Sequence, residues 1–406
     1  MREGLLQKLK RVRAKDIGHI FLFLAALIPA LLYKRRRPHL WLVCENENEA
    51  RDNGYWFFKY LREKQPQEDA IYAIKGCSGE YNKVASLGAT VEYGSYKHWI
   101  YYLMAEVNIG SQKYGKPNAA VCYLLEVILS WPKNTRVFLQ HGVTKDDLPF
   151  LHYDQTKMSL FCCAAKPEYE FVRDTFGYPE GAVQYVGLCR FDSLYSCEAD
   201  KELVLIVPTW RMWLERKIGQ EGEKEFLSSE YYWNWNGFIN SDELHELLRI
   251  YGKRAVFCLH RNMEKYERYM STKHENVQVL GWQEADITGL IHSAGTLITD
   301  FSSVYMDFAY MKKPVVYFQF DKEAFRAGHL PEGYFEYERD GFGPVCEDKD
   351  SLIRAMEEVF RNECRMSEEY AKRVDRFYTL HDDKNCERTY EAINALINRN
   401  RGKRVC

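Results

Sequence analysis

The chain lacks the short motifs that would assign it at once to several well-defined functional classes. It contains no H-E-x-x-H, Walker A or G-x-G-x-x-G sequence, and its twelve cysteines include no C-x-x-C pair. These absences exclude the motif-defined zinc proteases, the P-loop proteins and the common structural zinc sites, and they favour free thiols in a reducing compartment. The formal net charge is -2, so the chain has no overall basic footprint for nucleic acid.

The composition allows a large folded core. Apolar residues make up 46% of the 406 residues, which is enough for two ordinary domains and argues against wholesale disorder. Aromatic residues reach 15% and include 29 tyrosines. This abundance indicates either stacking surfaces or a belt at a membrane, and composition alone does not choose between them.

A basic and apolar segment occupies residues 1–37. Residues 1–16 are basic, residues 17–32 form an apolar run, and three arginines end the segment at Arg37. The run has 16 residues, whereas a membrane-spanning helix needs about 20. A signal peptide would end in small residues instead. We predict that the segment lies in the membrane interface, with its basic flanks on anionic headgroups. A buried core helix with a charged lead-in is the alternative.

Beyond residue 38, short apolar runs alternate with longer helical stretches, which is typical of parallel, doubly wound α/β sheets. One series of expected strands falls at 39–44, 71–75, 107–111, 136–140, 160–163 and 183–186, and a second falls at 203–207, 255–259, 277–280, 296–299 and 315–320. A polar stretch at 192–201 separates the two series. We therefore expect a Rossmann-like N-terminal domain over 38–195 and a second over 196–406, which would include a last helix at 367–399.

Polar residues follow several of the expected strands. In open parallel sheets, ligands bind beyond the carboxyl ends of the strands, so these residues are candidates for a site. His141-Gly142 and His260 follow two of the strands, and Thr209-Trp210-Arg211 follows a third. Asp300-Phe301-Ser302-Ser303 follows a fourth. Polar groups at four strand ends indicate a binding or catalytic site.

The turn at residues 300–304 is the sharpest of these features. Two hydroxyls, those of Ser302 and Ser303, lie between a strand and an apolar helix that starts at Val304. The free N–H groups of a helix start suit a phosphate, and hydroxyls can add donors. The alternative is an ordinary serine N-cap without a ligand. The other polar strand ends favour the phosphate site.

His141 is a candidate general base, because histidine titrates near neutral pH and can take the proton of an alcohol nucleophile. His260 could donate to a phosphate or a leaving group, and Arg211 could neutralise phosphate charge. A satisfied core histidine is the alternative for each histidine, and a surface salt bridge is the alternative for Arg211. Asp348-x-Asp350 looks like a metal-binding D-x-D but precedes a helix, which favours an N-cap.

Several motifs, in the same order, resemble those of the CDP-glycerol glycerophosphotransferase family, the teichoic-acid primases and polymerases. The resemblance covers residues 40–380, with departures from the usual residues at Val143, Cys189 and Arg261. The motifs are Arg51-Asp52-Asn53-Gly54-Tyr55, Gln140-His141-Gly142, Gly187-x-x-Arg190-Phe191-Asp192, Pro208-Thr209-Trp210-Arg211, Leu259-His260 and Thr299-Asp300-Phe301-Ser302-Ser303-Val304-x-x-Asp307-Phe308.

The resemblance implies a GT-B-like arrangement, in which two Rossmann-like domains face a cleft and the C-terminal domain binds the donor. It also implies that His141 is the catalytic base and that His260 is a second essential histidine near the donor pyrophosphate. The expected phosphate-binding residues are Ser302, Ser303, Arg211 and Asp300. Further candidates for donor or acceptor contacts are Thr209, Asp307, Arg190, Asp192, Asp52 and Asn53.

We therefore expect a transferase that moves glycerol phosphate or ribitol phosphate from a CDP-polyol to a polyprenyl-linked teichoic acid or other cell-wall glycan, with release of CMP. It would act at the cytoplasmic face of the cell membrane, without a cofactor, a protein-held metal or nucleic acid. A divalent ion that arrives with the donor is compatible with this expectation. Two alternatives stay open, a GT-B glycosyltransferase that uses a nucleotide sugar and a non-catalytic membrane scaffold.

Overall fold

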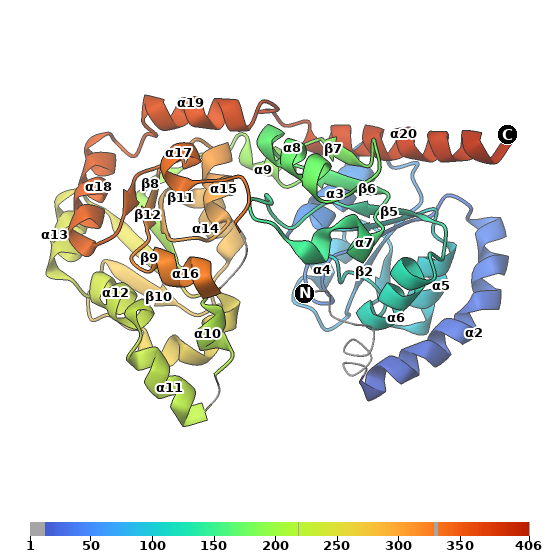
Figure 1. Cartoon of the computed structure of the whole chain (residues 1–406), viewed down its shortest axis with the longest axis horizontal. Helices are drawn as coiled ribbons and strands as arrows, with labels where there is room; N and C mark the ends of the chain where they lie inside the picture. Colours follow the sequence, from blue (N-terminus) through green and yellow to red (C-terminus); the bar gives the residue numbers. More distant parts are fainter. Residues whose placement is uncertain (1–12, 218, 329–331, 406) are drawn as a thin grey trace. The chain divides into compact units, whose positions relative to one another are not determined.

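The chain forms two compact α/β units, each built on one parallel sheet (Figure 1). The computed structural model describes residues 13–217, 219–328 and 332–405. Unit 1 comprises residues 1–143, 148–192 and 382–406, and unit 2 comprises residues 144–147 and 193–381. Two parallel sheets with interleaved helices confirm the predicted α/β class.

The sheet of unit 1 has seven strands in the order β3-β2-β1-β4-β5-β6-β7, and all neighbours are parallel. The strands are β1 (Trp41–Cys44), β2 (Ala70–Ile74), β3 (Thr90–Glu92), β4 (Val107–Gly110), β5 (Thr135–Phe138), β6 (Leu160–Cys163) and β7 (Val183–Tyr185). Every residue of β1, β2 and β6 is buried, so these strands read as continuous apolar runs. All strands but β3 match the prediction. Only the middle residue of β3 is buried, so this strand has no apolar run that the sequence could show.

The sheet of unit 2 has six parallel strands in the order β10-β9-β8-β11-β12-β13. The strands are β8 (Asp200–Val207), β9 (Arg254–Cys258), β10 (Val277–Leu280), β11 (Ala294–Thr299), β12 (Val315–Phe318) and β13 (Val345–Cys346). Only the two-residue edge strand β13 was not predicted. The carboxyl ends of β8, β9 and β11 carry the polar residues singled out above.

Helices connect the strands in both units. Those of unit 1 are α2 (Ala14–Arg36), α3 (Asn53–Lys64), α4 (Tyr81–Ala85), α5 (Tyr96–Met104), α6 (Ala119–Tyr123), the π-helical turn η1 (Leu124–Ile128), η2 (Pro149–Leu151), α7 (Tyr153–Thr156), α8 (Lys166–Thr175) and α20 (Asn385–Val405), and α9 (Phe191–Leu194) lies at the boundary. Those of unit 2 are α10 (Met212–Glu215), α11 (Gly219–Leu227), α12 (Glu230–Ile239), α13 (Asp242–Ile250), η3 (Arg261–Tyr269), α14 (Ile287–Ser293), α15 (Val304–Tyr310), α16 (Lys322–Gly328), α17 (Tyr337–Asp340), α18 (Lys349–Arg361) and α19 (Glu368–Phe377).

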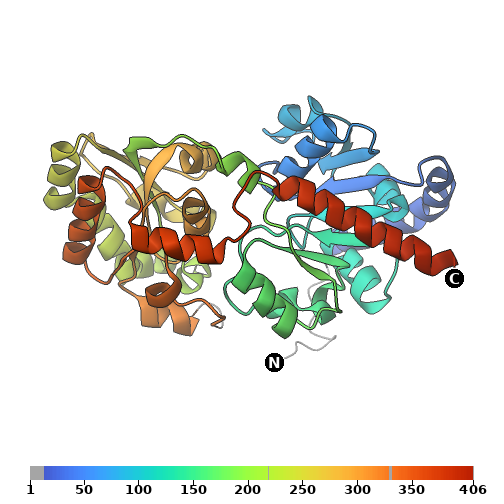
Figure 2. The same ribbon diagram turned by 90° about the horizontal axis from the view of Figure 1, so that it is seen from above.

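The predicted helix at 367–399 is two helices, α19 and α20, which belong to different units. Ile393 and Ile397 of α20 join the apolar core that contains β1, and Figure 2 shows α20 lying across unit 1. The Asp192 carboxylate holds its start, accepting the backbone N–H groups of Asn385 at 2.7 Å and Cys386 at 2.9 Å. The second domain therefore ends at residue 381, not 406. The last helix belongs to unit 1 because its apolar residues pack into the core of that unit.

Helix α2 has 23 residues and is longer than the predicted apolar run. One of its sides packs on α5 of the same unit. Ala26 and Ala30 are buried against the cluster that includes Trp99 of α5, and the Trp99 indole N–H donates to His19 at 3.1 Å. An 18-residue window within residues 15–36 has a mean hydropathy of 1.9, so by length and composition this helix could cross a membrane. The length argument against spanning is therefore wrong. Residues 1–12 of the predicted segment lie outside the described residues.

A buried arginine joins three strand ends of unit 2. Arg211, after β8, is fully buried and donates to Asp300, after β11, at 2.8 Å. It also donates to both carboxylate oxygens of Asp321, after β12, at 2.7 and 2.8 Å. Burial opposes the charge, but the two aspartates hold the pKa of Arg211 above its usual value. Arg211 therefore stays charged and ties the strand ends together.

We expect Arg211→Ala to lower the free energy of unfolding of unit 2 by about 3–5 kcal/mol, because it leaves two buried carboxylates without a counter-charge. Urea denaturation followed by tryptophan fluorescence measures this change. Arg249→Ala on α13 is the matched control, since its ion pair with Glu246 is exposed and should contribute little. If both variants unfold at the urea concentration that unfolds the unmodified chain, the buried cluster does not stabilise the unit.

Candidate functional site

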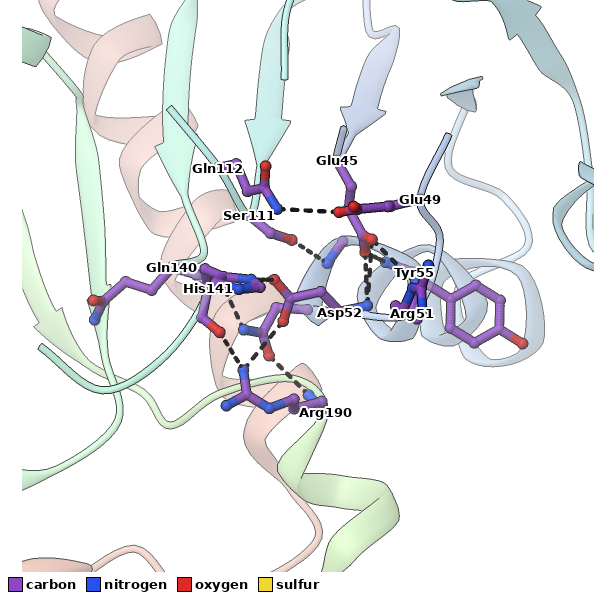
Figure 3. A network of polar contacts seen from close by, with 12 residues as sticks. Glu45, Glu49, Arg51, Asp52, Tyr55, Ser111, Gln112, Gln140, His141 and Arg190 are labelled. Carbon is purple, nitrogen blue, oxygen red and sulfur yellow. Dashed lines mark hydrogen bonds and ion pairs between the residues drawn. The ribbon is translucent and has the colours of Figure 1, made fainter. Parts of the chain in front are cut away.

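In unit 1, residues from strand ends and from the start of α3 form one polar network (Figure 3). His141 follows β5 with its side chain 71% exposed, and its Nδ1 lies 2.6 Å from Oδ2 of the buried Asp52. Arg190 donates from Nη1 to the other oxygen of Asp52 at 3.1 Å and to the backbone oxygen of His141 at 2.7 Å. Three residues predicted from separate motifs therefore meet at one place.

Gln140, directly before His141, fixes the direction of the His141 side chain. Gln140 has a φ of 64°, in the left-handed region that non-glycine residues seldom adopt. Its side-chain amide donates to Cys162 O at 2.6 Å and to the Glu168 carboxylate at 2.8 Å. Its own carbonyl accepts from the Asn53 amide at 2.8 Å. A strained backbone persists only where its surroundings hold it, so these buried bonds set the position of the next side chain.

Asp52 controls the charge and the tautomer of His141. Its negative charge raises the pKa of the imidazole, against the opposing effects of desolvation and of Arg190. Because Nδ1 faces a carboxylate, it carries the proton in the neutral ring. The lone pair is then on Nε2. This is the arrangement that a general base for an alcohol requires.

Glu45 is a second carboxylate in this network, and the sequence analysis missed it. It directly follows β1, is fully buried, and accepts the backbone N–H groups of Arg51 at 3.1 Å, Asp52 at 3.1 Å and Tyr55 at 2.6 Å. Burial raises the pKa of Glu45 to about 8, and the charge of Asp52 adds to this effect. Glu45 thus anchors the start of α3, and with it Asp52.

Gly54 and Ser111 complete this anchor. The Ser111 hydroxyl, directly after β4, accepts the Gly54 N–H at 2.6 Å. A Cβ at Gly54 would lie 2.8 Å from Cγ of Glu45, so only glycine fits there without displacement. Glu45 follows the expected strand at 39–44, so the rule that pointed to His141 would have found it. Ser111 was instead placed inside the expected strand at 107–111, which ends at Gly110.

In unit 2, the predicted phosphate turn lies between β11 and α15. Ser303 occupies the N-cap position of α15, but its side chain makes no capping bond. The Ser302 hydroxyl lies 3.5 Å from the backbone nitrogen of Val304, at the limit of a hydrogen bond. The buried Thr209 hydroxyl, after the neighbouring β8, has no hydrogen-bond partner among the described residues. Ordinary capping therefore does not account for these hydroxyls.

His260 follows β9 and has a structural role that the sequence did not indicate. Its Nδ1 accepts the backbone N–H of Asn262 at 3.2 Å and so caps η3. In the neutral ring the proton is then on Nε2, which can donate to an anion. The ring lies between Trp210 and Trp282, with centroid distances of 6.2 and 6.1 Å.

The structure corrects the predicted ligand contacts of Arg211, Asp300 and Asp192. Arg211 and Asp300 are fully buried and bind each other. The other oxygen of Asp300 accepts the N–H groups of Thr209 at 2.7 Å and Phe301 at 2.6 Å. The Asp192 carboxylate is occupied by the start of α20. The polar atoms of these three side chains are occupied by hydrogen bonds within the protein. Their role is therefore to hold strand ends and the start of a helix in place.

The structure also places Asp307, Asn53 and Asp348, which the sequence analysis singled out. Asp307 is buried on α15, and Asn53 supports His141 as described. Asp348 is the N-cap residue of α18 and accepts the Ser351 N–H at 2.7 Å, which confirms the capping interpretation of Asp348-x-Asp350. Within the described ranges, no group of three or more His, Cys, Asp or Glu side chains is placed to hold a metal ion.

Comparison with protein families gives one match over most of the chain. The model of the family described as CDP-Glycerol:Poly(glycerophosphate) glycerophosphotransferase matches residues 30–395. The minor teichoic acid biosynthesis protein GgaB of Bacillus subtilis (strain 168) is 30% identical over 402 residues. The aligned part is 96% of this chain and 42% of GgaB, so this chain spans less than half the length of that relative.

Solved structures of the wall teichoic acid polymerase TagF share the fold. One has a TM-score of 0.68 at 16% identity and covers 97% of each chain. Another, a TagF variant soaked with CDPG, has a TM-score of 0.62 at 16% identity and covers 99% of this chain and 100% of its own. The shared fold confirms the predicted GT-B-like class. From the family match over residues 30–395, the chain belongs to the CDP-glycerol:poly(glycerophosphate) glycerophosphotransferase family.

Proposed function

We propose that this chain transfers glycerol phosphate or ribitol phosphate from a CDP-polyol to a hydroxyl of a membrane-linked teichoic acid or related cell-wall glycan. The observation that carries the proposal is the exposed His141 ring, whose Nδ1 lies 2.6 Å from a buried aspartate. Membership of the family and the CDPG in the TagF structure support a CDP-linked donor. The names of GgaB and TagF support a teichoic acid acceptor.

In the proposed reaction, Nε2 of His141 takes the proton of the acceptor hydroxyl. The hydroxyl oxygen forms a bond to the donor phosphorus that bears the polyol, and the bond from that phosphorus to the bridging oxygen of CMP breaks. CMP leaves with the electron pair. Asp52 stabilises the imidazolium that forms, and Arg190 holds Asp52 in place. Positioning and charge stabilisation supply most of the rate enhancement in such phosphoryl transfers.

The donor pyrophosphate binds at the strand ends of unit 2 in this proposal. The hydroxyls of Ser302, Ser303 and Thr209 are the donors available at the ends of β11 and β8. His260 adds an N–H from Nε2, because its Nδ1 already accepts a backbone bond. Donors aimed at an oxyanion stabilise the charge that develops on a leaving phosphate.

We infer that α2 lies in the cytoplasmic interface of the membrane. Many of its exposed apolar side chains recur at helical spacing. The exposed large apolar side chains are Ile17, Ile20, Phe21, Leu24, Ile28, Leu31, Leu32 and Tyr33. A second exposed apolar group adjoins them, since the Trp131 ring lies 5.9 Å from that of Phe23, and it comprises Leu124, Ile128, Leu129 and Trp131. Because the other side of α2 is docked on α5, a helix lying in the interface fits better than one that crosses.

The proposal is tested by offering CDP-glycerol, CDP-ribitol and UDP-sugars together with a lipid-linked acceptor, and measuring nucleotide release. We expect CMP from a CDP-polyol, and a loss of about 100- to 10,000-fold in His141→Ala, which removes the base but leaves CDP binding intact. His39→Ala, at an exposed histidine of the same unit, is the control. UDP release would favour a glycosyltransferase, and no release from any donor would favour a scaffold.

Asp52→Asn should shift the pH dependence of turnover. The Asp52 charge raises the pKa of His141, so its removal lowers that pKa. The base must be neutral to act, and the rising limb of the profile should therefore move to lower pH, while the plateau falls because the ring loses its orienting partner. Turnover is measured from about pH 5 to pH 9, with Asp174→Asn, an exposed aspartate, as control. An unmoved limb would remove Asp52 from the mechanism.

Replacing Phe21 and Ile28 by glutamate should detach the chain from vesicles that contain anionic lipid. These side chains are 67% and 70% exposed, and each buried apolar side chain of this size contributes about 1.5–3 kcal/mol. We expect the vesicle-bound fraction in a sedimentation assay to fall at least about tenfold. Ile250→Glu on α13, 61% exposed, is the control. Equal binding of the double variant and the unmodified chain would refute the assignment of this face.

A further inference from the structure

Three partly exposed rings lie at the carboxyl ends of neighbouring strands in unit 2. Trp210 follows β8, His260 follows β9 and Trp282 follows β10. Cys258 of β9 pairs with Leu280 of β10, so His260 and Trp282, each two residues further on, are level with each other. The His260 ring is stacked on Trp210 with an interplanar angle of 23° and tilted against Trp282 at 40°.

Trp282 follows the buried Gly281 just past the end of β10, and its side chain is partly exposed. The His260 ring lies beside it, at a centroid distance of 6.1 Å. A large aromatic ring that stays partly exposed is suited to stacking with a planar ligand.

On the other side of the phosphate turn, the strand ends are closed. The Arg211, Asp300 and Asp321 cluster fills the space beyond β11 and β12. The buried rings of Phe301 and Phe325 stack at 3.9 Å over it, with the Arg211 guanidinium 5.3 and 5.0 Å from their centroids. A nucleoside attached to a phosphate at Ser302 and Ser303 would therefore run toward β9 and β10, where His260 and Trp282 are partly exposed.

We propose that the pyrimidine base of the nucleotide donor stacks on Trp282, with the nucleoside running from the turn after β11 across the ends of β8 and β9. This inference rests on the proposed donor site. In the sheet order, β10 lies three strands from β11, which at about 4.8 Å per strand is about 14 Å. An extended nucleoside diphosphate is of comparable length. Trp282 would thus bind the base, while Ser302 and Ser303 bind the phosphates.

Binding of CDP and of inorganic pyrophosphate to the full chain in detergent separates the two roles. Calorimetry gives the affinity for CDP, and competition against CDP gives that for pyrophosphate. Trp282→Ala and Trp282→Leu should weaken CDP binding about ten- to a hundredfold and leave pyrophosphate binding unchanged, because base stacking alone is lost. Trp282→Phe should restore most of the affinity. Trp233→Ala on α12, where the side chain is 66% exposed, is the control and should bind as the unmodified chain does.

Ser303→Ala distinguishes failure of this inference from failure of the donor site. It should weaken CDP and pyrophosphate alike. If Ser303→Ala weakens CDP binding but Trp282→Leu does not, the stacking proposal alone is overturned. Equal losses of CDP and pyrophosphate in the Trp282 variants would also overturn it, since the ring would then act only by supporting His260. If the unmodified chain binds no CDP, the proposed donor site fails first.

Discussion

Both candidate sites depend on buried carboxylates that accept backbone N–H groups beyond the ends of parallel strands. Glu45 binds three such groups at the start of α3 in unit 1. Asp300 binds those of Thr209 and Phe301 in unit 2. Backbone donors past a strand end have no ladder partner, and burying them unsatisfied is costly. Each carboxylate therefore fixes the loop that carries the functional side chains before any ligand arrives.

The two units use their charges differently. In unit 1, Asp52 is placed against an exposed histidine and raises its pKa, so the charge acts on a group that can meet a substrate. In unit 2, the buried Arg211 is neutralised by two aspartates. A cation engaged in this way cannot also neutralise a phosphate. Among the residues predicted for the donor site, neutral hydroxyls and His260 are the remaining candidates for phosphate contacts.

Much of the fold could be predicted because buried parallel strands read as apolar runs, and only the short β3 and β13 gave no signal. The site was predicted in part. The resemblance named His141 and Asp52, but their pairing across 89 residues appears only in three dimensions. Glu45 was missed because the strand-end rule was not applied to β1. Arg211 was misassigned because its sequence position carries no information about burial.

The sequence by itself determined the α/β class, most of the strands, the strand ends that carry polar groups and the family. These features depend on local periodicity and short motifs, which a chain expresses without reference to distant residues. Tertiary structure alone decided which carboxylate faces His141 and which ones bind backbone, that α20 completes unit 1, and that one face of α2 stays exposed. These features depend on contacts between residues that are far apart in the sequence. Such contacts are set by how the side chains pack in the folded chain.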